Sequence, residues 1–407
     1  MDNDVVVTGM GVACHMGDSL GSILGKLREG SSEPFHRYEE AAALDARCTL
    51  IGRFPGDLSD ASLGIDKSIG RFMGRASRLA LRASRGALEQ AQAPTSDLAV
   101  IFGSGSGDTD THREISSKLE QTKSMRKVSP FVVPKIMAST VSANLVNALQ
   151  TKGPSCSITA ACAGGAWNIA VGAMLLRSSA CTRVLVGGTE SMDVHFHAGF
   201  DSMRAYNSSD NARPEIASRP YSKDRAGFIF SEGAGALVLE TRKSAAERGA
   251  TILGVVKGFG MSSDGEGEMV APNSDGAFRA MEQALQASQL SPEQIDYVNT
   301  HGTSTPVGDI GEVEAIRRIM GGRRVPYSST KGYTGHTVSA AGAIEAIFTI
   351  AMLREGWIAP CVNITELDPK LSDFPPVQKS QNANLRYALS NSFGFGGTNV
   401  SLALARP

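Results

Sequence analysis

The sequence has no long uninterrupted apolar stretch, no excess of charge of either sign and little proline. None of its apolar runs approaches the roughly 20 residues that a transmembrane helix needs. Its 40 Lys and Arg residues balance 41 Asp and Glu residues, which excludes the global basic field of a nucleic-acid-binding protein. Only 17 prolines accompany 44 glycines, so disorder does not explain the glycine content. We therefore expect a globular protein with neither membrane nor nucleic-acid partners.

The sequence also lacks the features of a secretory signal. Its acidic start runs directly into the apolar segment Val5–Val7, so no basic region followed by an apolar region precedes a cleavage site. The six cysteines are scattered along the chain, which suits free thiols better than a disulfide framework. We therefore predict a cytoplasmic protein.

Glycine is the residue that the sequence has in excess. It makes up about 11% of the chain (44 of 407 residues), against roughly 7% in an average protein. Because glycine permits tight turns and close backbone approach, the excess predicts many of both. The length corresponds to two or three units of roughly 150 residues each, or to one large composite domain.

Short apolar segments alternate with longer helical patterns. Val5–Val7, Ala99–Phe102 and Arg183–Val186 are typical of short strands that run into glycine. Alanine and leucine recur at helical spacing over Ser77–Gln92. This alternation predicts an α/β fold with a parallel or mixed sheet. The polar segment Ser202–Ala226 predicts a long surface loop of the kind that often forms a lid.

The pattern recurs in the second half of the chain. The helical segment at residues 80–88 has an echo at residues 277–285, and each is followed by a proline, an aspartate, a short strand and a glycine-containing loop. The Val-Gly-Gly-Thr segment 186–189 is similar to the Phe-Gly-Gly-Thr segment 395–398. Two fused halves would place the functional site where they meet, whereas chance similarity of two strand–helix units is the alternative. The predicted halves are residues 1–250 and 251–407.

Cys162 stands out among the cysteines because a strand-like run precedes it and a helical pattern follows it. At a helix N-terminus, unpaired N–H groups and the positive end of the dipole predict a lowered thiol pKa and a reactive thiolate. The same N–H groups can bind an oxyanion. A buried, inert cysteine is the alternative for Cys162. It is our expectation for the cysteines without this setting, Cys14, Cys48, Cys156, Cys181 and Cys361.

Two histidines lie in glycine-containing segments of the second half. His301 ends a predicted strand at a position where the first half has Phe102, so its imidazole is not needed to form the turn. His336 precedes a long apolar helix, whose positive dipole end favours a neutral, hydrogen-bond-donating imidazole. The segment 391–399 brings glycines and two phenyl rings close to a cleft.

Together, and in this order, these segments resemble the β-ketoacyl-acyl-carrier-protein synthases of the elongating type I and type II class, within the thiolase superfamily. The resemblance covers essentially the whole chain and includes residues 5–11, 264–265 and 269–272. It implies a thiolase-like α/β fold in which two duplicated βαβ halves form a five-layer α-β-α-β-α sandwich. A Cys-His-His set distinguishes this class from initiating synthases, which use Cys-His-Asn, and from degradative thiolases, which use a second cysteine.

The resemblance implies a decarboxylative Claisen condensation in fatty-acid chain elongation. Cys162 would carry the acyl group, and His301 and His336 would stabilise the enolate formed from malonyl-acyl-carrier protein. Lys331 would order the histidines, with Glu312 or, less directly, Glu345 as its ion-pair partner. The resemblance also implies an oxyanion hole formed by the backbone N–H groups of Cys162 and Phe395. Phe393 and Phe395 would form an acyl gate, and Thr303 and Thr305 would bind pantetheine.

The same resemblance implies how substrates arrive. No resident cofactor and no metal are expected, because 4'-phosphopantetheine arrives on the acyl carrier protein with the acyl and malonyl thioesters. A homodimer is expected, or a heterodimer with a ketosynthase-like partner. Because carrier proteins are acidic, a local basic patch should receive them. Our candidates for carrier-protein docking are Lys67, Arg71, Lys123, Arg126 and Lys127.

At two positions the sequence departs from the usual pattern of this family, and the identity of the acyl chain is therefore left open. After the nucleophile the chain reads Ala163-Gly164-Gly165, where relatives often carry Ala-Thr or Ala-Ser, and the glycine predicts a looser first helical turn. Ser106 lies in a loop expected to border the acyl chain, and its size indicates no particular chain length.

Several alternatives compete with this interpretation. A ketosynthase of a specialised type II polyketide or polyene pathway is the main one, and a non-catalytic chain-length partner is another, although Cys162 counts against it. Residues 103–107 lack the full Gly-x-Gly-x-x-Gly pattern, so nucleotide binding is not predicted. His195 and His197 lack further ligands at metal spacing, so a surface or dimer-contact role is expected for them.

Overall fold

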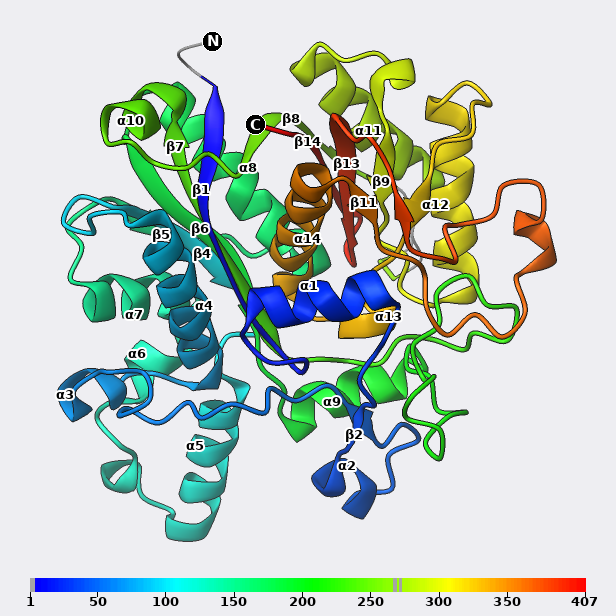
Figure 1. The fold of residues 1–407 in the computed structure, drawn as a ribbon. Helices are drawn as coiled ribbons and strands as arrows, with labels where there is room; N and C mark the ends of the chain where they lie inside the picture. Colours follow the sequence, from blue (N-terminus) through cyan, green and yellow to red (C-terminus); the bar gives the residue numbers. More distant parts are fainter. Residues whose placement is uncertain (1–3, 266–268, 271–272) are drawn as a thin grey trace.

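A mixed β-sheet runs through the whole molecule (Figure 1). The computed structural model describes residues 4–265, 269–270 and 273–407; Ala271 and Pro272, part of the resemblance above, lie outside them. The ten strands of the sheet are β1 (Val5–Cys14), β4 (Ala99–Ser104), β5 (Ser155–Cys156), β6 (Arg183–Glu190), β7 (Gly233–Thr241), β8 (Gly254–Ser263), β9 (Tyr297–Asn299), β10 (Tyr327–Ser328), β13 (Tyr387–Gly394) and β14 (Thr398–Ala405). Two small hairpin-like pairs, β2 (His36–Arg37) with β3 (Leu50–Ile51) and β11 (Trp357–Ile358) with β12 (Gln381–Asn382), lie outside it.

The strand order confirms the predicted duplication. Outward from the centre, one half of the sheet runs β1-β7-β6-β4-β5 and the other runs β8-β14-β13-β9-β10. In each half the outer three strands are parallel and the inner ones antiparallel. The halves join through a short antiparallel pairing of Val5–Val7 with 254–256. The predicted boundary at residue 250 falls just before β8.

Helices fill the layers around the two half-sheets, which confirms the five-layer arrangement (Figure 1). The helices α8 and α14 lie between the half-sheets, α4 and α7 cover the first half, and α11 and α12 cover the second. Every residue of α14 from 341 to 353 is buried, because a central helix meets apolar neighbours on all sides. The bounds of the layer helices are α4 (Arg75–Ala91), α7 (Thr140–Leu149), α8 (Gly164–Arg177), α11 (Ser274–Ser288), α12 (Pro306–Ile319) and α14 (Ala341–Glu355).

The remaining helices are peripheral and connect the layers. No helix among the described residues combines the length and apolarity needed to cross a bilayer. They are α1 (Leu20–Glu29), α2 (Glu39–Ala43), α3 (Lys67–Gly70), α5 (Thr109–Thr122), α6 (Val132–Ile136), α9 (Val194–Ser202), α10 (Arg242–Glu247) and α13 (Lys331–Thr334), with 3₁₀ turns η1 (Met125–Lys127), η2 (Ala161–Ala163), η3 (Pro292–Gln294), η4 (Val338–Ala340) and η5 (Pro369–Leu371).

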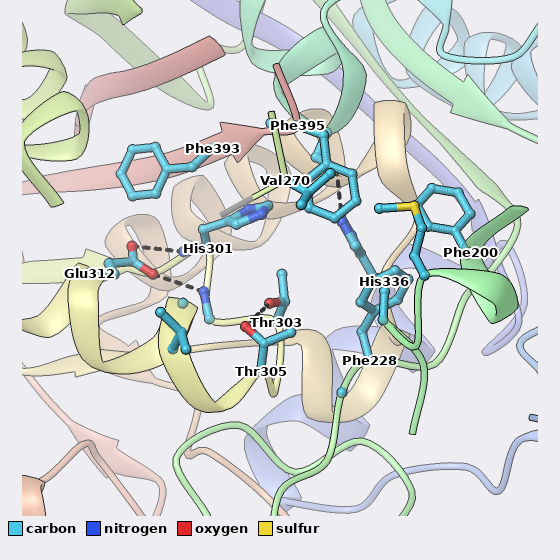
Figure 2. A pocket seen from close by; sticks show the side chains of 18 of the residues that line it. Phe200, Phe228, Val270, His301, Thr303, Thr305, Glu312, His336, Phe393 and Phe395 are labelled. Carbon is cyan, nitrogen blue, oxygen red and sulfur yellow. Dashed lines mark hydrogen bonds between the residues drawn. The ribbon is translucent and has the colours of Figure 1, made fainter. Parts of the chain in front are cut away.

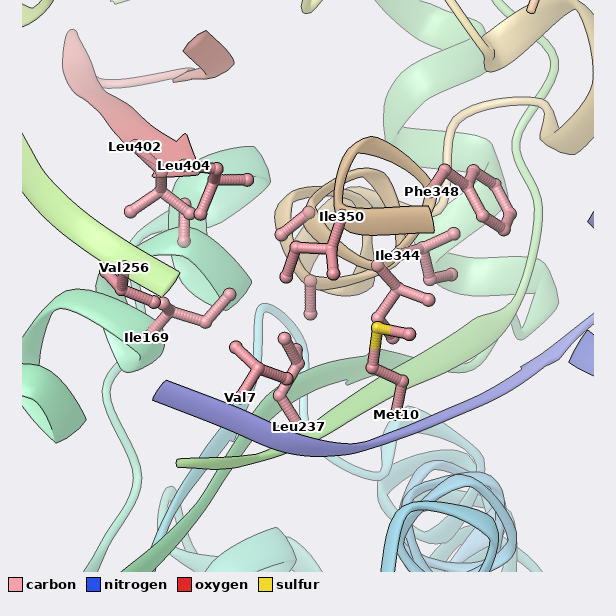
Figure 3. Packing of buried hydrophobic residues seen from close by; sticks show 14 of the residues in the cluster. Val7, Met10, Ile169, Leu237, Val256, Ile344, Phe348, Ile350, Leu402 and Leu404 are labelled. Carbon is pink, nitrogen blue, oxygen red and sulfur yellow. The ribbon is translucent and has the colours of Figure 1, made fainter. Parts of the chain in front are cut away.

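The largest apolar core lies in the central layer (Figure 3). Ile169 of α8 and Ile344 and Ile350 of α14 meet Val7 and Leu402 from the two half-sheets. Each of these side chains is almost fully buried. Burial of a side chain of this size contributes roughly 1.5–3 kcal/mol, so the central helices bind the halves into one unit.

The glycine–threonine segment 186–189 was expected to form a turn like that of 395–398, and this expectation was wrong. The segment 186–189 is no turn, because β6 continues to Glu190 and the equivalent turn occurs only at 395–397. Gly188 is instead a point of close contact, since a Cβ there would lie 2.1 Å from the Ser339 carbonyl oxygen. Ser202–Ala226 is held to the second half of the chain by a hydrogen bond from Ser218 Oγ to the Lys331 carbonyl oxygen at 2.7 Å, and its role as a lid stays a prediction.

Gly11 offers a test of close approach between β1 and α4. A Cβ at Gly11 would lie 2.0 Å from the Ala83 carbonyl oxygen, so we expect Gly11→Ala to lower the free energy of unfolding by about 1–3 kcal/mol or more. Gly25→Ala in α1 is the control. It meets nothing within 4 Å and should raise the free energy of unfolding by up to about 1 kcal/mol. Chemical denaturation measures both, and equal effects would contradict the packing argument.

Candidate active site

Cys162 occupies the 3₁₀ turn η2, which leads directly into α8. This is the strand-to-helix setting expected from the sequence, and the side chain is 5% exposed. The backbone N–H groups of Phe395 and of Cys162 itself both favour a negative charge on the sulfur. These are the two N–H groups assigned above to an oxyanion hole, and the structure places both beside Sγ.

The predicted low pKa of the Cys162 thiol was wrong. Burial raises this pKa to about 12, although the Lys331 charge and the two N–H groups act to lower it. The loss of solvation thus outweighs the helix terminus, because the sulfur lies beneath other side chains. The resting nucleophile is therefore a neutral thiol.

His336 lies beside this thiol, between α13 and η4. Its Nε2 is 3.0 Å from Sγ of Cys162, and its backbone N–H donates to the Ile229 carbonyl oxygen. Burial, and then the Lys331 charge, lowers the pKa of His336 well below its usual value. The imidazole is therefore neutral as expected, with burial rather than the helix dipole as the main cause.

His301 follows β9 and completes the set. Its ring lies 5.4 Å from the His336 ring, and burial again lowers its pKa well below the usual value. Nζ of Lys331 lies 3.5 Å from its Nδ1. An ammonium has no lone pair, so Nδ1 must accept and the ring proton must sit on Nε2. Lys331 thus presents His301 as a donor.

Lys331 pairs with Glu345 rather than with Glu312, which reverses the expected order of partners. Both members of the Lys331–Glu345 ion pair are at most 2% exposed. Glu312 instead accepts the backbone N–H groups of His301 and Gly302, each at 2.9 Å. Burial raises the pKa of each of these two carboxyls to about 7. Glu312 therefore holds the His301 turn directly, and Glu345 holds Lys331.

Asn391 is a residue of this network that the sequence did not single out. Its amide donates to Glu312 at 3.0 Å, and Ser401 donates to its oxygen at 2.8 Å. Only its place in the segment 391–399 hinted at a role. It couples β13 and β14 to the His301 turn.

A cavity of about 350 Å³ opens onto these groups (Figure 2). The ring centroids of Phe393 and His301 are 5.9 Å apart, and Figure 2 shows Phe395 above His336. Thr303 and Thr305, whose hydroxyls are 3.1 Å apart, line the opposite wall. Met203 and Arg204 of the expected lid segment also line the cavity, together with Phe200 and Phe228, which the sequence did not identify. Ser106 is absent from the lining residues that the structure describes.

The glycine segment after Phe395 is held to a neighbouring segment. Gly396 N–H donates to the Met269 carbonyl oxygen at 2.7 Å, and Asp264 N–H donates to the Gly397 carbonyl oxygen at 2.9 Å. Gly396 and Gly397 have φ of 83° and 73°, a region that favours glycine. Phe395 thus directly precedes a turn that favours glycine.

The other predicted positions lie away from this cavity. The five basic candidates for docking are exposed and lie on or near α3 and η1, outside the cavity lining, so their role stays a prediction. His197 is buried against Cys48 and Tyr206, so its expected surface role was wrong. Among the described residues only Cys162, His301 and His336 bring three potential ligand atoms within 4.8 Å, and a metal-free site stays a prediction.

Nearly the whole chain is similar to known proteins. Residues 2–245 match the family described as "Beta-ketoacyl synthase, N-terminal domain", and residues 253–365 match its C-terminal domain. The chain is 36% identical to "3-oxoacyl-[acyl-carrier-protein] synthase 1" of Haemophilus influenzae, with 98% of both chains covered. A beta-ketoacyl synthase structure from Burkholderia phymatum matches with a TM-score of 0.93 and 34% identity over 99% of both chains. The ishigamide ketosynthase/chain length factor matches with a TM-score of 0.90 and 28% identity over the full length of both.

The pKa of Cys162 predicts how its alkylation depends on pH. With a thiol pKa of about 12, the rate of reaction with iodoacetamide should rise about tenfold per pH unit from neutral to mildly alkaline pH, without levelling off. Peptide mass spectrometry would follow Cys162, with the exposed Cys156 as an internal control. A plateau near neutral pH would instead indicate the low-pKa thiolate that the sequence predicted.

Proposed function

The chain belongs to the β-ketoacyl synthase family, and we propose that it condenses an acyl group carried on Cys162 with malonyl-acyl-carrier protein to form β-ketoacyl-acyl-carrier protein, in fatty-acid elongation. The observation that carries this proposal is the convergence of Cys162, His336 and His301 in one buried cavity. A nucleophile and two neutral imidazoles are the groups that acyl transfer followed by decarboxylation requires.

In the first half-reaction, the Cys162 sulfur attacks the carbonyl carbon of an acyl thioester on the phosphopantetheine arm. The C–S bond to the arm breaks, and the N–H groups of Cys162 and Phe395 stabilise the oxyanion. His336 Nε2 is 3.0 Å from the sulfur and relays its proton to the departing thiolate. Because its pKa is far below the usual value, His336 passes the proton on rather than keeping it.

In the second half-reaction, malonyl thioester loses CO₂ and leaves an enolate. His301 Nε2–H donates to the enolate oxygen. His336 is the second donor, with its ring proton on Nε2, because the acylated sulfur no longer has a proton to donate to that nitrogen. The Lys331 charge keeps the His301 proton on Nε2. The enolate carbon then attacks the acyl-Cys162 carbonyl carbon, a C–C bond forms and the C–S bond breaks. The released thiolate takes a proton from water.

The substrate arm needs a route to this centre. We propose that Thr303 and Thr305 bind the pantetheine, that Phe393 and Phe395 gate the acyl pocket, and that no resident cofactor takes part. The carrier protein is proposed to dock on the exposed residues Arg126 and Lys127 with their basic neighbours. A homodimer working in the cytoplasm, where six unpaired cysteines stay reduced, completes the proposal.

A specialised polyketide ketosynthase is the second candidate. The full-length match to the ishigamide ketosynthase/chain length factor favours it. A non-catalytic chain-length partner agrees poorly with Cys162 and its hydrogen bond to His336. The identity of the acyl chain separates the first two candidates.

The central experiment incubates the protein with malonyl-carrier protein and a panel of acyl-carrier proteins of different length and unsaturation. We expect an acyl adduct on the protein by intact mass and a β-ketoacyl product two carbons longer. Cys162→Ala should abolish the adduct, because the attacking sulfur is gone. Saturated acyl chains as sole substrates support elongation, whereas polyketide chains as sole substrates support the second candidate. An adduct that persists in Cys162→Ala would contradict the assignment.

Charge reversal tests the docking surface. Arg126→Glu with Lys127→Glu should weaken carrier-protein binding at least several-fold at low salt, since opposite charges steer the partners together. A matched double variant, Arg324→Glu with Lys379→Glu, reverses two exposed charges elsewhere. Surface plasmon resonance with acyl-carrier protein measures both. Equal affinity of the two variants would place the docking site elsewhere.

A further inference from the structure

Glu190 is a buried carboxylate that the mechanism above does not use. It ends β6, is 0% exposed and lies outside the lining of the cavity. No ion-pair partner is present for it among the described residues, whereas the buried Glu232 and Glu240 pair with Arg75 and Arg248. Burial raises the pKa of this carboxyl, and only its hydrogen bonds act to lower it.

Four of those hydrogen bonds come from the loop after β4. The N–H groups of Gly105 and Ser106 donate to its two oxygens at 2.9 and 3.1 Å. The hydroxyls of Ser104 and Ser106 donate to Oε1 at 2.8 and 2.6 Å. So many donors fix both the loop and the position of the carboxylate.

A fifth donor comes from the other half of the chain. The N–H of Ser339 donates to Oε2 at 3.4 Å. Ser339 lies in η4, three residues after His336, and Val338 of the same turn belongs to the apolar cluster that contains Cys162. Glu190 therefore links the first half to the segment that carries His336.

In the second half of the chain a buried carboxylate likewise holds the turn that carries His301. Glu312 also lacks an ion-pair partner among the described residues and accepts two consecutive N–H groups, those of His301 and Gly302. The turns after β4 and β9, which are equivalent strands, are thus each held by one buried carboxylate. One of these turns carries His301, and the other faces Val338 beside the nucleophile.

We propose that Glu190 is a positioning residue that holds η4 and the 104–106 loop against the Cys162 turn, and that its carboxylate disfavours the Cys162 thiolate. The charged and titratable groups that face Cys162 are His336, His301, Lys331 and Glu190. Lys331 favours the thiolate and Glu190 disfavours it. A charged Glu190 thus adds to burial, which is the main cause of the raised pKa of the Cys162 thiol. Its description as a positioning residue rests on the proposed function, whereas its effect on the thiol does not.

Two substitutions separate charge from position. Glu190→Gln removes the charge at nearly constant shape, so the iodoacetamide reaction of Cys162 should become faster, by up to about tenfold at a given pH, which equals a shift of one pH unit. Condensation should slow at least tenfold in kcat with KM little changed, because Glu190 touches no substrate. Glu190→Asp keeps the charge but shortens the side chain, so the alkylation profile should match the wild type while kcat falls. Ser106→Ala keeps the charge, removes one donor and serves as a control for a loosened loop.

The outcomes distinguish the possible failures. An unchanged alkylation profile in folded Glu190→Gln would overturn the charge effect. If Ser106→Ala accelerated the alkylation of Cys162 equally, the cause would be greater exposure of the thiol and not the lost charge. Unchanged kcat in Glu190→Asp would overturn the positioning role, and this variant decides the matter if Glu190→Gln does not fold. Absence of condensation in the wild type would refute the proposed function while leaving the alkylation comparison valid.

Discussion

The close approach of α8 and α14 is the constraint on which the site depends. A Cβ at Gly165 would lie 2.7 Å from the Ala343 nitrogen, and a Cβ at Gly342 would lie 2.8 Å from the Ala166 nitrogen. The helices therefore touch backbone to backbone near their N-termini. Cys162 immediately precedes one helix and His336 shortly precedes the other, so this contact brings Sγ and Nε2 to 3.0 Å. Larger side chains at the contact would separate the nucleophile from its partner.

Burial then sets the chemistry of the groups that this contact brings together. In water at neutral pH the thiol would be mostly neutral, the imidazoles partly protonated and the carboxyls ionised. Loss of solvation keeps Cys162 and both histidines neutral and raises the pKa of Glu312 and Glu345 to about 7. Lys331 stays buried because Glu345 compensates its charge. The charged groups of the site therefore lie behind the groups that would contact the substrate, and those contacting groups are neutral hydrogen-bond donors.

The sequence predicted the parts of the molecule that local patterns determine. The strand-to-helix turn at Cys162, the strand end at His301 and the repeated strand order all follow from short segments, and the structure contains them. Contacts between distant elements were beyond its reach. Whether Glu312 or Glu345 pairs with Lys331 depends on how α12 and α14 are placed relative to Lys331 in the folded chain. The spacing of these residues in the sequence does not encode that placement. The predicted pKa of the Cys162 thiol was wrong for a related reason. The helix terminus, which lowers the pKa, can be recognised in the sequence, whereas the side chains that bury Cys162 and raise its pKa cannot.

Gly164 illustrates how a local interpretation changes once a distant partner is known. From the sequence alone, glycine after the nucleophile predicted a looser helical turn. In the structure a Cβ at Gly164 would lie 2.3 Å from the Ser339 hydroxyl oxygen, so the missing side chain is replaced by one from η4. Ser339 is fully buried, and its N–H is the donor that reaches Glu190. The volume that a larger residue would fill beside Cys162 is thus supplied by the other half of the chain, and the turn is packed rather than loose.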